Sequence, residues 1–357
     1  MMSVWVEALS LGVTTLVEYL REHTVTCLVP AFFIAGAIAA TVSKDTILKY
    51  FGYKVKRWLS HGVASISGTV LAVCSCTILP MFAGIYKRGG GIGPATTFLY
   101  SGPAINLIAI VLTARILGIG LGIARAIGAI LIGIVVGLIM GYIFEGDESK
   151  DSSKQLSTID TDEESEGRSQ FASFGFFASL VGILVFATAG YLPSIVRWPA
   201  VGVSIVLTII IALTKYSRGE NKEWIHETWW LARQLVPVLF VGVFVVGVVK
   251  YFMPYEIIRS IMGVGTVLPS FLGSIIGGLL YMPTLLEPNI VGDLFGYSQG
   301  VITSGAALAL LLGGPSLSLP NMLVIWRTIG AKKTIIYIIL VVIFSTIAGI
   351  VFQMLVG

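Results

Sequence analysis

Long apolar runs separated by short polar breaks dominate the sequence from end to end. A transmembrane helix needs about 20 mostly apolar residues to cross the hydrocarbon core of a bilayer, and the chain has room for about ten such segments. A membrane β-barrel would instead alternate polar and apolar positions, whereas Ile119–Phe144 is one long apolar run. The pattern predicts an all-α, polytopic integral membrane helical bundle. The expected segments lie near residues 24–43, 62–86, 93–112, 117–143, 174–192, 196–214, 234–253, 264–286, 297–320 and 334–356.

The polar breaks divide the chain into five expected regions. Residues 1–22 combine a partly apolar face with Glu7 and Glu18, which favours an N-terminal helix lying in the membrane interface. Residues 145–171 are rich in Asp, Glu, Ser and Lys and cannot bury apolar surface, so we expect a disordered polar linker. The other regions are a first membrane repeat at 23–144, two connecting transmembrane helices at 172–216 and a second membrane repeat at 217–357.

The two membrane repeats share ordered landmarks at a nearly constant spacing, which indicates two homologous halves. The landmarks pair Leu28-Val29-Pro30 with Leu235-Val236-Pro237, Thr77 with Thr284, Gly102-Pro103 with Gly314-Pro315, and Arg115 with Arg327. Repeated halves are typical of secondary transporters, whose substrate site lies where corresponding helices are broken. Four spans per repeat would make the halves parallel, and three spans with a re-entrant hairpin would invert them. The Gly-Pro breaks favour the inverted arrangement.

Proline and glycine mark the expected helix breaks inside both repeats. One pair of breaks covers Cys74–Pro80 and Tyr281–Pro288, and the other covers Ser101–Pro103 and Gly313–Pro315. Backbone groups freed at membrane depth are tolerated only where protein or a water-filled cavity satisfies them. The helix-break residues are Pro80, Gly102, Pro103, Pro283, Pro288, Gly314 and Pro315.

Composition and motifs narrow the class further. Hydrophobic residues make up 56% of the chain and charged residues 12%, against about 25% charged in soluble proteins, which excludes a soluble globular protein. The net charge of +4 is spread over loops, so nucleic acid is not an expected partner. Nucleotide-binding, hydrolase and zinc-protease motifs are missing, which argues against an enzyme and against a cofactor. The expected partners are the lipid bilayer, a small-molecule substrate moved by a gradient, and a second copy of the chain.

Cys74 and Cys76 form the sharpest chemical feature. Residues two apart point to different sides of an intact helix, but Pro80 cannot donate to the carbonyl of Cys76, so an unwound turn could aim both sulfurs into one cavity. Paired thiolates favour soft metals and metalloids, and a trivalent methylated arsenical offers two exchangeable positions. The alternative is that both cysteines are small buried core residues.

Polar residues beside the breaks are the other candidates. Glu287 is expected to relay protons, because a carboxylate at membrane depth is functional by default, and Asp293 is assigned to the same coupling role. The alternative places both acids in an exposed loop. Thr77, Ser101, Asn106, Thr284 and Asn321 are expected to line the substrate site, although the two asparagines could instead satisfy freed backbone groups. Arg115 and Arg327 suit snorkelling anchors, and Gly133, Gly137 and Gly141 suit close helix packing.

Three stretches carry a resemblance to a known family: Val73–Pro80 (VCSCTILP), Gly84–Gly90 (GIYKRGG) and Thr96–Asn106 (TTFLYSGPAIN). They resemble the predicted permease family that includes the organoarsenical (methylarsenite) efflux permeases. The resemblance extends to the plan of two related halves and a polar central linker. It implies a multi-pass plasma-membrane permease, with trivalent methylated or aromatic arsenicals as substrates of the characterised branch.

By this resemblance, Cys74 and Cys76 match the family's cysteine motif, and Ser101, Pro103 and Asn106 match its second motif. We therefore expect efflux of a small thiophilic substrate by alternating access. One alternative is a permease for another small anion or metabolite, with structural cysteines. A further alternative is an intramembrane thiol oxidoreductase, which the spacing disfavours because redox pairs usually adopt Cys-x-x-Cys.

Overall fold

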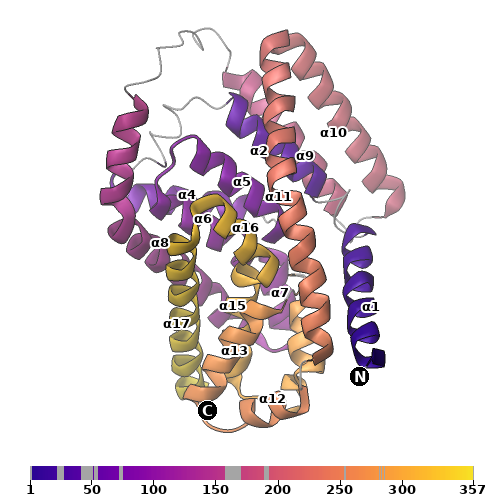
Figure 1. Ribbon diagram of the computed structural model, residues 1–357, viewed down its shortest axis with the longest axis vertical. Coiled ribbons are helices and arrows are strands. Elements are labelled where there is room, and N and C mark those ends of the chain that lie inside the picture. Colours follow the sequence, from indigo (N-terminus) through magenta and orange to yellow (C-terminus); the bar gives the residue numbers. More distant parts are fainter. Residues whose placement is uncertain are drawn as a thin grey trace.

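The computed structural model describes residues 2–21, 28–41, 51, 55–71, 75–156, 170–188, 193–252, 255–280, 282, 284 and 286–356. Throughout these residues the ordered elements are helices, without a strand (Figure 1). The first group of helices comprises α1 (Met2–Tyr19), α2 (Val29–Thr41), α4 (Arg57–Leu71), α5 (Ser75–Lys87), α6 (Ile92–Ala104), α7 (Leu107–Ile116), α8 (Ile119–Leu156), α9 (Gln170–Thr188) and α10 (Ser194–Lys215). The second comprises α11 (Arg218–Phe252), α12 (Tyr255–Met262), α13 (Val267–Leu279), α14 (Glu287–Asn289), η2 (Ile290–Leu294), η3 (Tyr297–Gln299), α15 (Ser304–Leu317), α16 (Leu319–Ile329) and α17 (Ala331–Val356).

The described helices support a protein that crosses a membrane several times. Four of them are long and apolar enough to span a bilayer, and the number rises to six if each of two bent pairs is one span. Val29–Thr41, Phe174–Ala187 and Val267–Leu279 are shorter apolar helices. The all-helical, multi-span class predicted from the sequence is therefore confirmed, whereas the total of ten segments stays a prediction.

Both bent pairs lie where the sequence predicted broken helices. Ile92–Ala104 meets Ala109–Ile116 at 45°, and Ser304–Leu317 meets Leu319–Ile329 at 44°. In each pair the helix continues through its Gly-Pro dipeptide and ends shortly afterwards. A proline lacks the N–H that the preceding turn needs but holds a helical φ, so the break follows the proline rather than coinciding with it.

The centre of the molecule is made where the two bent pairs face each other. α6 packs on α4 and α8, and α15 packs in the same way on α13 and α17. α15 also contacts α6 and α8, and the hydroxyl of Tyr100 in α6 donates to the carbonyl of Leu312 in α15 at 3.1 Å. The long helix α11 runs beside this core and contacts α1, α2 and α16 (Figure 1).

Small residues allow the central helices to approach closely, as predicted for the glycine row of α8. A Cβ added at Gly137 would lie 1.9 Å from Oγ1 of Thr97, and one at Gly141 would lie 3.4 Å from Cα of Gly93. The row therefore packs against α6. Gly133 faces the same helix, with Tyr100 at 3.2 Å, and the packing role of the row is confirmed.

Two local expectations need correction. The linker expected at 145–171 is helical at both ends, because α8 continues to Leu156 and α9 begins at Gln170. Extending an existing helix costs little, and Glu, Lys and Gln are good helix formers. Pro80, which was expected to mark a helix break, lies inside α5, which is helical from Ser75. The carbonyl that its missing N–H leaves without a donor belongs to Cys76 in the first turn.

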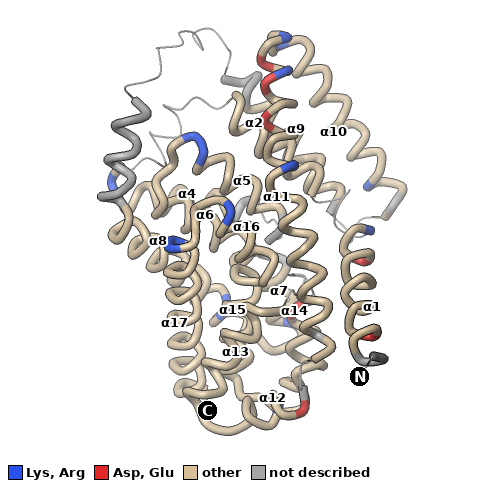
Figure 2. The backbone as a smooth tube through the Cα atoms, in the orientation of Figure 1, with Lys and Arg blue, Asp and Glu red and all other residues tan. Residues whose placement is uncertain are grey.

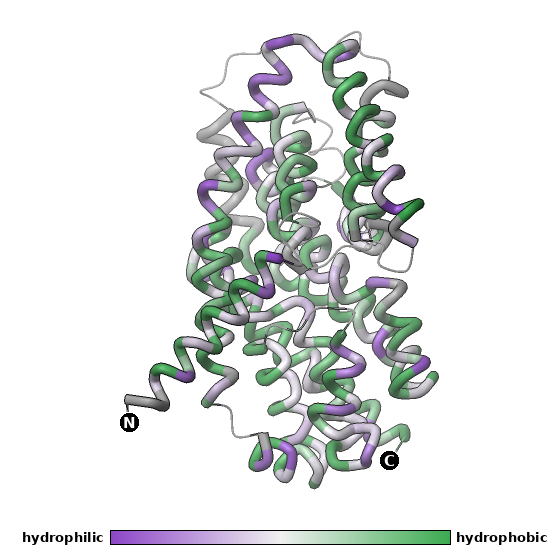
Figure 3. The backbone as a smooth tube through the Cα atoms, turned by 90° about the vertical axis from the view of Figure 1, so that its right-hand side faces the viewer, coloured by the Kyte–Doolittle hydropathy of each residue, from purple (hydrophilic) through white to green (hydrophobic). Residues whose placement is uncertain are grey.

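Among the described residues, charge is sparse and gathers at the N-terminal end of α11 (Figure 2), and Figure 3 shows hydrophobic positions along most of the backbone. There Lys87, from the end of α5, contacts Glu227 with Nζ and Oε2 2.5 Å apart. The same ammonium lies 4.0 Å from the ring centre of Trp230. Arg88 approaches Glu223 at 3.8 Å. These contacts join the α5–α6 turn to α11, a helix more than 100 residues later in the sequence.

Candidate functional site: a buried ion pair between the helix breaks

A fully buried ion pair joins α8 to the segment that precedes α15. Nη2 of Arg125 donates to Oε2 of Glu287 at 2.7 Å, and both side chains have 0% exposure. Nη1 of Arg125 donates at 2.9 Å to Oγ1 of Thr113, whose own hydroxyl donates to the carbonyl of Ala109 at 2.7 Å. Three elements therefore meet at one charged site inside an apolar protein.

Arg125 lies on the buried face of α8, where helical spacing aligns it with residues four and seven positions away. Its neighbours on that face, Leu121, Ala129, Ile132 and Val136, are all buried. A Cβ added at Gly122 would lie 2.6 Å from Cβ of Ala114, so α7 and α8 approach closely. This approach brings the hydroxyl of Thr113 within reach of the guanidinium.

Glu287 reaches the pair from the break predicted at Tyr281–Pro288. The residue begins the short helix α14 and is buried together with Pro288, so the alternative of an exposed loop is wrong for Glu287. A Cβ added at Gly314 in α15 would lie 3.2 Å from Oε1 of Glu287 and 3.1 Å from Cε of Met282. The break around Glu287 and the break at Gly314-Pro315 are therefore in direct contact.

Several buried polar atoms at this junction have no hydrogen-bond partner. They include Oε1 of Glu287 and Nε of Arg125, one atom from each member of the ion pair, and Oγ1 of Thr284. The hydroxyls of Ser316 and Ser318, at the end of α15, are in the same state. Buried polar groups normally have partners, and an unpaired one calls for an explanation such as a functional role or a bound water or ion. The buried groups without a partner therefore comprise an acceptor on Glu287, a donor on Arg125 and three hydroxyls that can donate or accept.

The energetics also favour a functional reading of this pair. Removing two charges from water costs several kcal/mol per ion, and their attraction repays that cost only with excellent geometry and further hydrogen bonds. Here the pair has one direct bond and one supporting hydroxyl. Such a pair contributes little to stability compared with apolar packing, so its presence calls for another explanation.

The other predicted residues differ in whether the structure describes them and in how far they are buried. Cys74 and Pro283 lie outside the described residues, and Cys76 is described only as part of the helix α5. Thr77 in α5 is buried. Pro103 lies buried in α6, and Pro315 lies buried in α15. Asp293 is exposed on η2 and does not share the buried position of Glu287.

The predicted polar residues near the Gly-Pro breaks bond to the backbone. The amide oxygen of Asn106 accepts from N–H of Ala109 at 3.4 Å, and Nδ2 of Asn321 donates to the carbonyl of Pro315 at 3.4 Å. The hydroxyl of Ser101 donates to the carbonyl of Phe98 at 3.3 Å. Both asparagines thus serve the freed backbone, which was one of the two interpretations of these residues.

Arg125 and Thr113 were not among the candidates taken from the sequence. Arg125 is the one charged residue within Ile119–Phe144, and the high hydropathy of that run conceals it. The rule that selected Glu287, that a charge at membrane depth is functional, applies equally to Arg125. Thr113 carries no comparable signal, because threonine is common in membrane helices.

Comparison with known proteins decides the family. The family model described as "Predicted permease" matches residues 10–354. The chain belongs to this family. The UPF0718 protein MJ0584 of Methanocaldococcus jannaschii is 40% identical over 359 residues, which cover 98% of this chain and 96% of that protein. The UPF0718 protein YraQ of Escherichia coli is 21% identical over 304 residues, covering 84% of this chain and 68% of YraQ. No solved structure matches.

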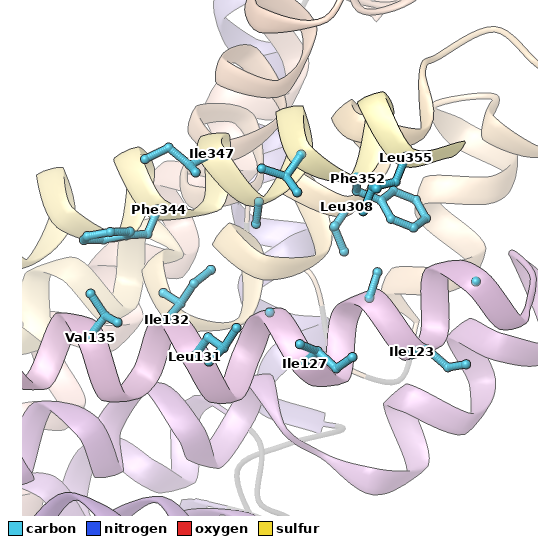
Figure 4. A pocket seen from close by; sticks show the side chains of 15 residues that line it. Ile123, Ile127, Leu131, Ile132, Val135, Leu308, Phe344, Ile347, Phe352 and Leu355 are labelled. Carbon is cyan, nitrogen blue, oxygen red and sulfur yellow. The ribbon is translucent and has the colours of Figure 1, made fainter. Parts of the chain in front are cut away.

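The permease also has a large apolar groove between α8 and α17, whose side chains point toward one another (Figure 4). Its volume is about 480 Å³, and its lining includes Ile127 and Leu131 of α8 and Phe344 and Phe352 of α17. All of its side chains are apolar and offer no hydrogen bond. Within the described residues no three His, Cys, Asp or Glu side chains gather as a metal site would require.

Proposed function

We propose that this permease moves a small molecule across the membrane by alternating access around its paired helix breaks. The buried contact between Arg125 and Glu287 carries the proposal, because it joins α8 to a break in the second part of the chain. Charged residues at membrane depth mark substrate or ion pathways. Discontinuous helices at the interface of repeats are the usual place for such a pathway.

The arrangement of the breaks supports two structurally related halves. The bent pair α6–α7 corresponds to α15–α16, with nearly equal angles of 45° and 44°. Contacts between the parts follow the same correspondence, since α7 packs on α14 while α16 packs on α5. In our proposal one half rocks against the other, and these contacts form and separate during the transport cycle.

For the substrate we propose a small thiophilic compound such as a trivalent methylated arsenical, exported across the plasma membrane. The support is the cysteine motif at Cys74 and Cys76 and the family to which the chain belongs. Soft thiolate ligands select soft metals and metalloids. Release at the far side requires reversible thiol exchange, and coupling to protons would use Glu287.

A second candidate is a permease for a small anion with structural cysteines. The buried guanidinium of Arg125 favours it, because arginine recognises carboxylate and phosphate groups through fixed pairs of donors. An intramembrane thiol oxidoreductase remains a third candidate, and its cysteine pair would form a disulfide during turnover.

The test is uptake of methylarsenite by everted membrane vesicles, with and without a proton gradient. We expect accumulation by the wild-type protein and a loss of at least about tenfold in the Cys74→Ser/Cys76→Ser variant, because both sulfurs bind the substrate. A Cys27→Ser variant is the matched control and should transport normally. Unchanged uptake by the double variant would refute substrate binding by the two sulfurs, and no uptake by the wild type would favour the anion permease. Trapping of a Cys74–Cys76 disulfide in turnover would favour the oxidoreductase.

A further inference from the structure

The ion pair between Arg125 and Glu287 leaves one polar atom of each partner unused. Oε2 of Glu287 is bonded to Nη2 of Arg125, while Oε1 of Glu287 and Nε of Arg125 are buried without a partner. The hydroxyl of Thr284, three residues before Glu287, is also buried and unpartnered. The site thus holds more hydrogen-bonding capacity than the ion pair consumes.

The charge balance of the site links two binding events. Arginine stays protonated under all conditions in proteins, so Glu287 alone can gain or lose a proton. Protonating Glu287 without any other change would leave the guanidinium buried and uncompensated, which is strongly unfavourable. A second anion at Arg125 would restore the balance and would permit the proton to stay on Glu287.

Among the described residues, no other charged group around Glu287 could take the place of Arg125 as its counter-ion. Arg125 is the charged group that acts on Glu287 electrostatically. α7 contributes Thr113 through Arg125, and its Arg115 is exposed; η2 contributes Asp293, which is also exposed. α15 approaches with the backbone of Gly314. Binding of a proton and binding of an anion are therefore coupled through one arginine.

Building on the proposed transport function, we propose that Arg125, Glu287 and Thr284 form a binding site for a singly charged oxyanion, which replaces Glu287 as the counter-ion of Arg125 while Glu287 takes up one proton. With Glu287 neutral, the guanidinium carries one uncompensated positive charge, so the site suits a single negative charge. Nε and Nη2 of Arg125 offer a planar pair of donors that fits a carboxylate or a similar oxyanion. The hydroxyl of Thr284 and the proton on Glu287 are further donors.

Calorimetric titration of the purified full-length protein with formate and with nitrate tests the site. Experiments in two buffers of different ionisation enthalpy count the protons taken up with each anion. For the wild-type protein we expect close to one proton per anion, and an affinity that falls about tenfold for each unit of rising pH. In the Glu287→Gln variant the counter-ion is gone, so binding should become tighter at neutral pH and independent of pH.

Further variants keep the result interpretable. The Arg125→Gln/Glu287→Gln variant removes both charges together and should fold, but it should bind neither anion at any pH. Arg115→Gln removes an exposed arginine from α7 and should titrate like the wild type. Binding without proton uptake in the wild type, binding by the double variant, or no binding at any pH would each overturn the proposal.

The same variants separate this proposal from the proposed thiophilic substrate. Wild-type protein that transports methylarsenite but binds no anion with a proton would retain the transport proposal and refute the oxyanion site. Proton-linked anion binding without methylarsenite transport would do the reverse.

Discussion

At the scale of single residues, the account depends on two charges that are stable only together. Replacing Arg125 by Gln leaves Glu287 buried without its partner, which typically costs about 3–5 kcal/mol. The Arg125→Gln/Glu287→Gln variant carries no buried charge and should recover most of that loss. Thermal unfolding of the purified variants in detergent measures both effects. A double variant no more stable than Arg125→Gln would show that Arg125 contributes through packing rather than charge.

The sequence identified only one member of this pair, for a physical reason. Glu287 stands between Pro283 and Pro288, and this interruption of an apolar segment drew attention to it. Arg125 stands in an unbroken helix, where periodicity alone decides whether it points inward. Since the buried face of α8 becomes visible only when its neighbours are placed, the pairing of Arg125 with Glu287 required the structure.

At the scale of elements, close backbone contact between helices predicts opposite effects on stability for Gly→Ala changes at two glycines. A Cβ added at Gly277 in α13 would lie 2.7 Å from the carbonyl oxygen of Leu310 in α15. Gly277→Ala must push these helices apart, and we expect a loss of about 1–3 kcal/mol. Gly202→Ala in α10 meets nothing within 4 Å and should gain up to about 1 kcal/mol from helix propensity. Unfolding of both variants, measured side by side, contradicts the packing account if Gly277→Ala is the milder change.

The helix breaks show how far an element can be predicted from its residues. The Gly-Pro dipeptides correctly indicated which helices are broken, and α6 and α15 each end soon after theirs. The exact ends depend on bonds that come from outside the helix, such as the one from Nδ2 of Asn321 to the carbonyl of Pro315. The composition of the polar segment after Phe144 did not reveal that the preceding helix extends into it as far as Leu156.

At the scale of the whole molecule, the charged site acts as a contact between two parts of the chain that are proposed to move. α7 and α8 provide Thr113 and Arg125, whereas the segment before α15 provides Glu287. A rocking motion of one part against the other would change this contact directly. The apolar groove between α8 and α17 has no polar side chain whose contacts such a motion could change.

The most direct test of the account is transport by the Arg125→Gln/Glu287→Gln variant beside its stability. The variant retains the shape of the side chain at position 287, shortens the one at position 125 and removes both buried charges. We predict thermal stability close to that of the wild type together with methylarsenite uptake into everted vesicles reduced to less than about one tenth, because the coupling charge is gone. Wild-type uptake by a stably folded double variant would contradict the account and would make the ion pair a purely structural contact.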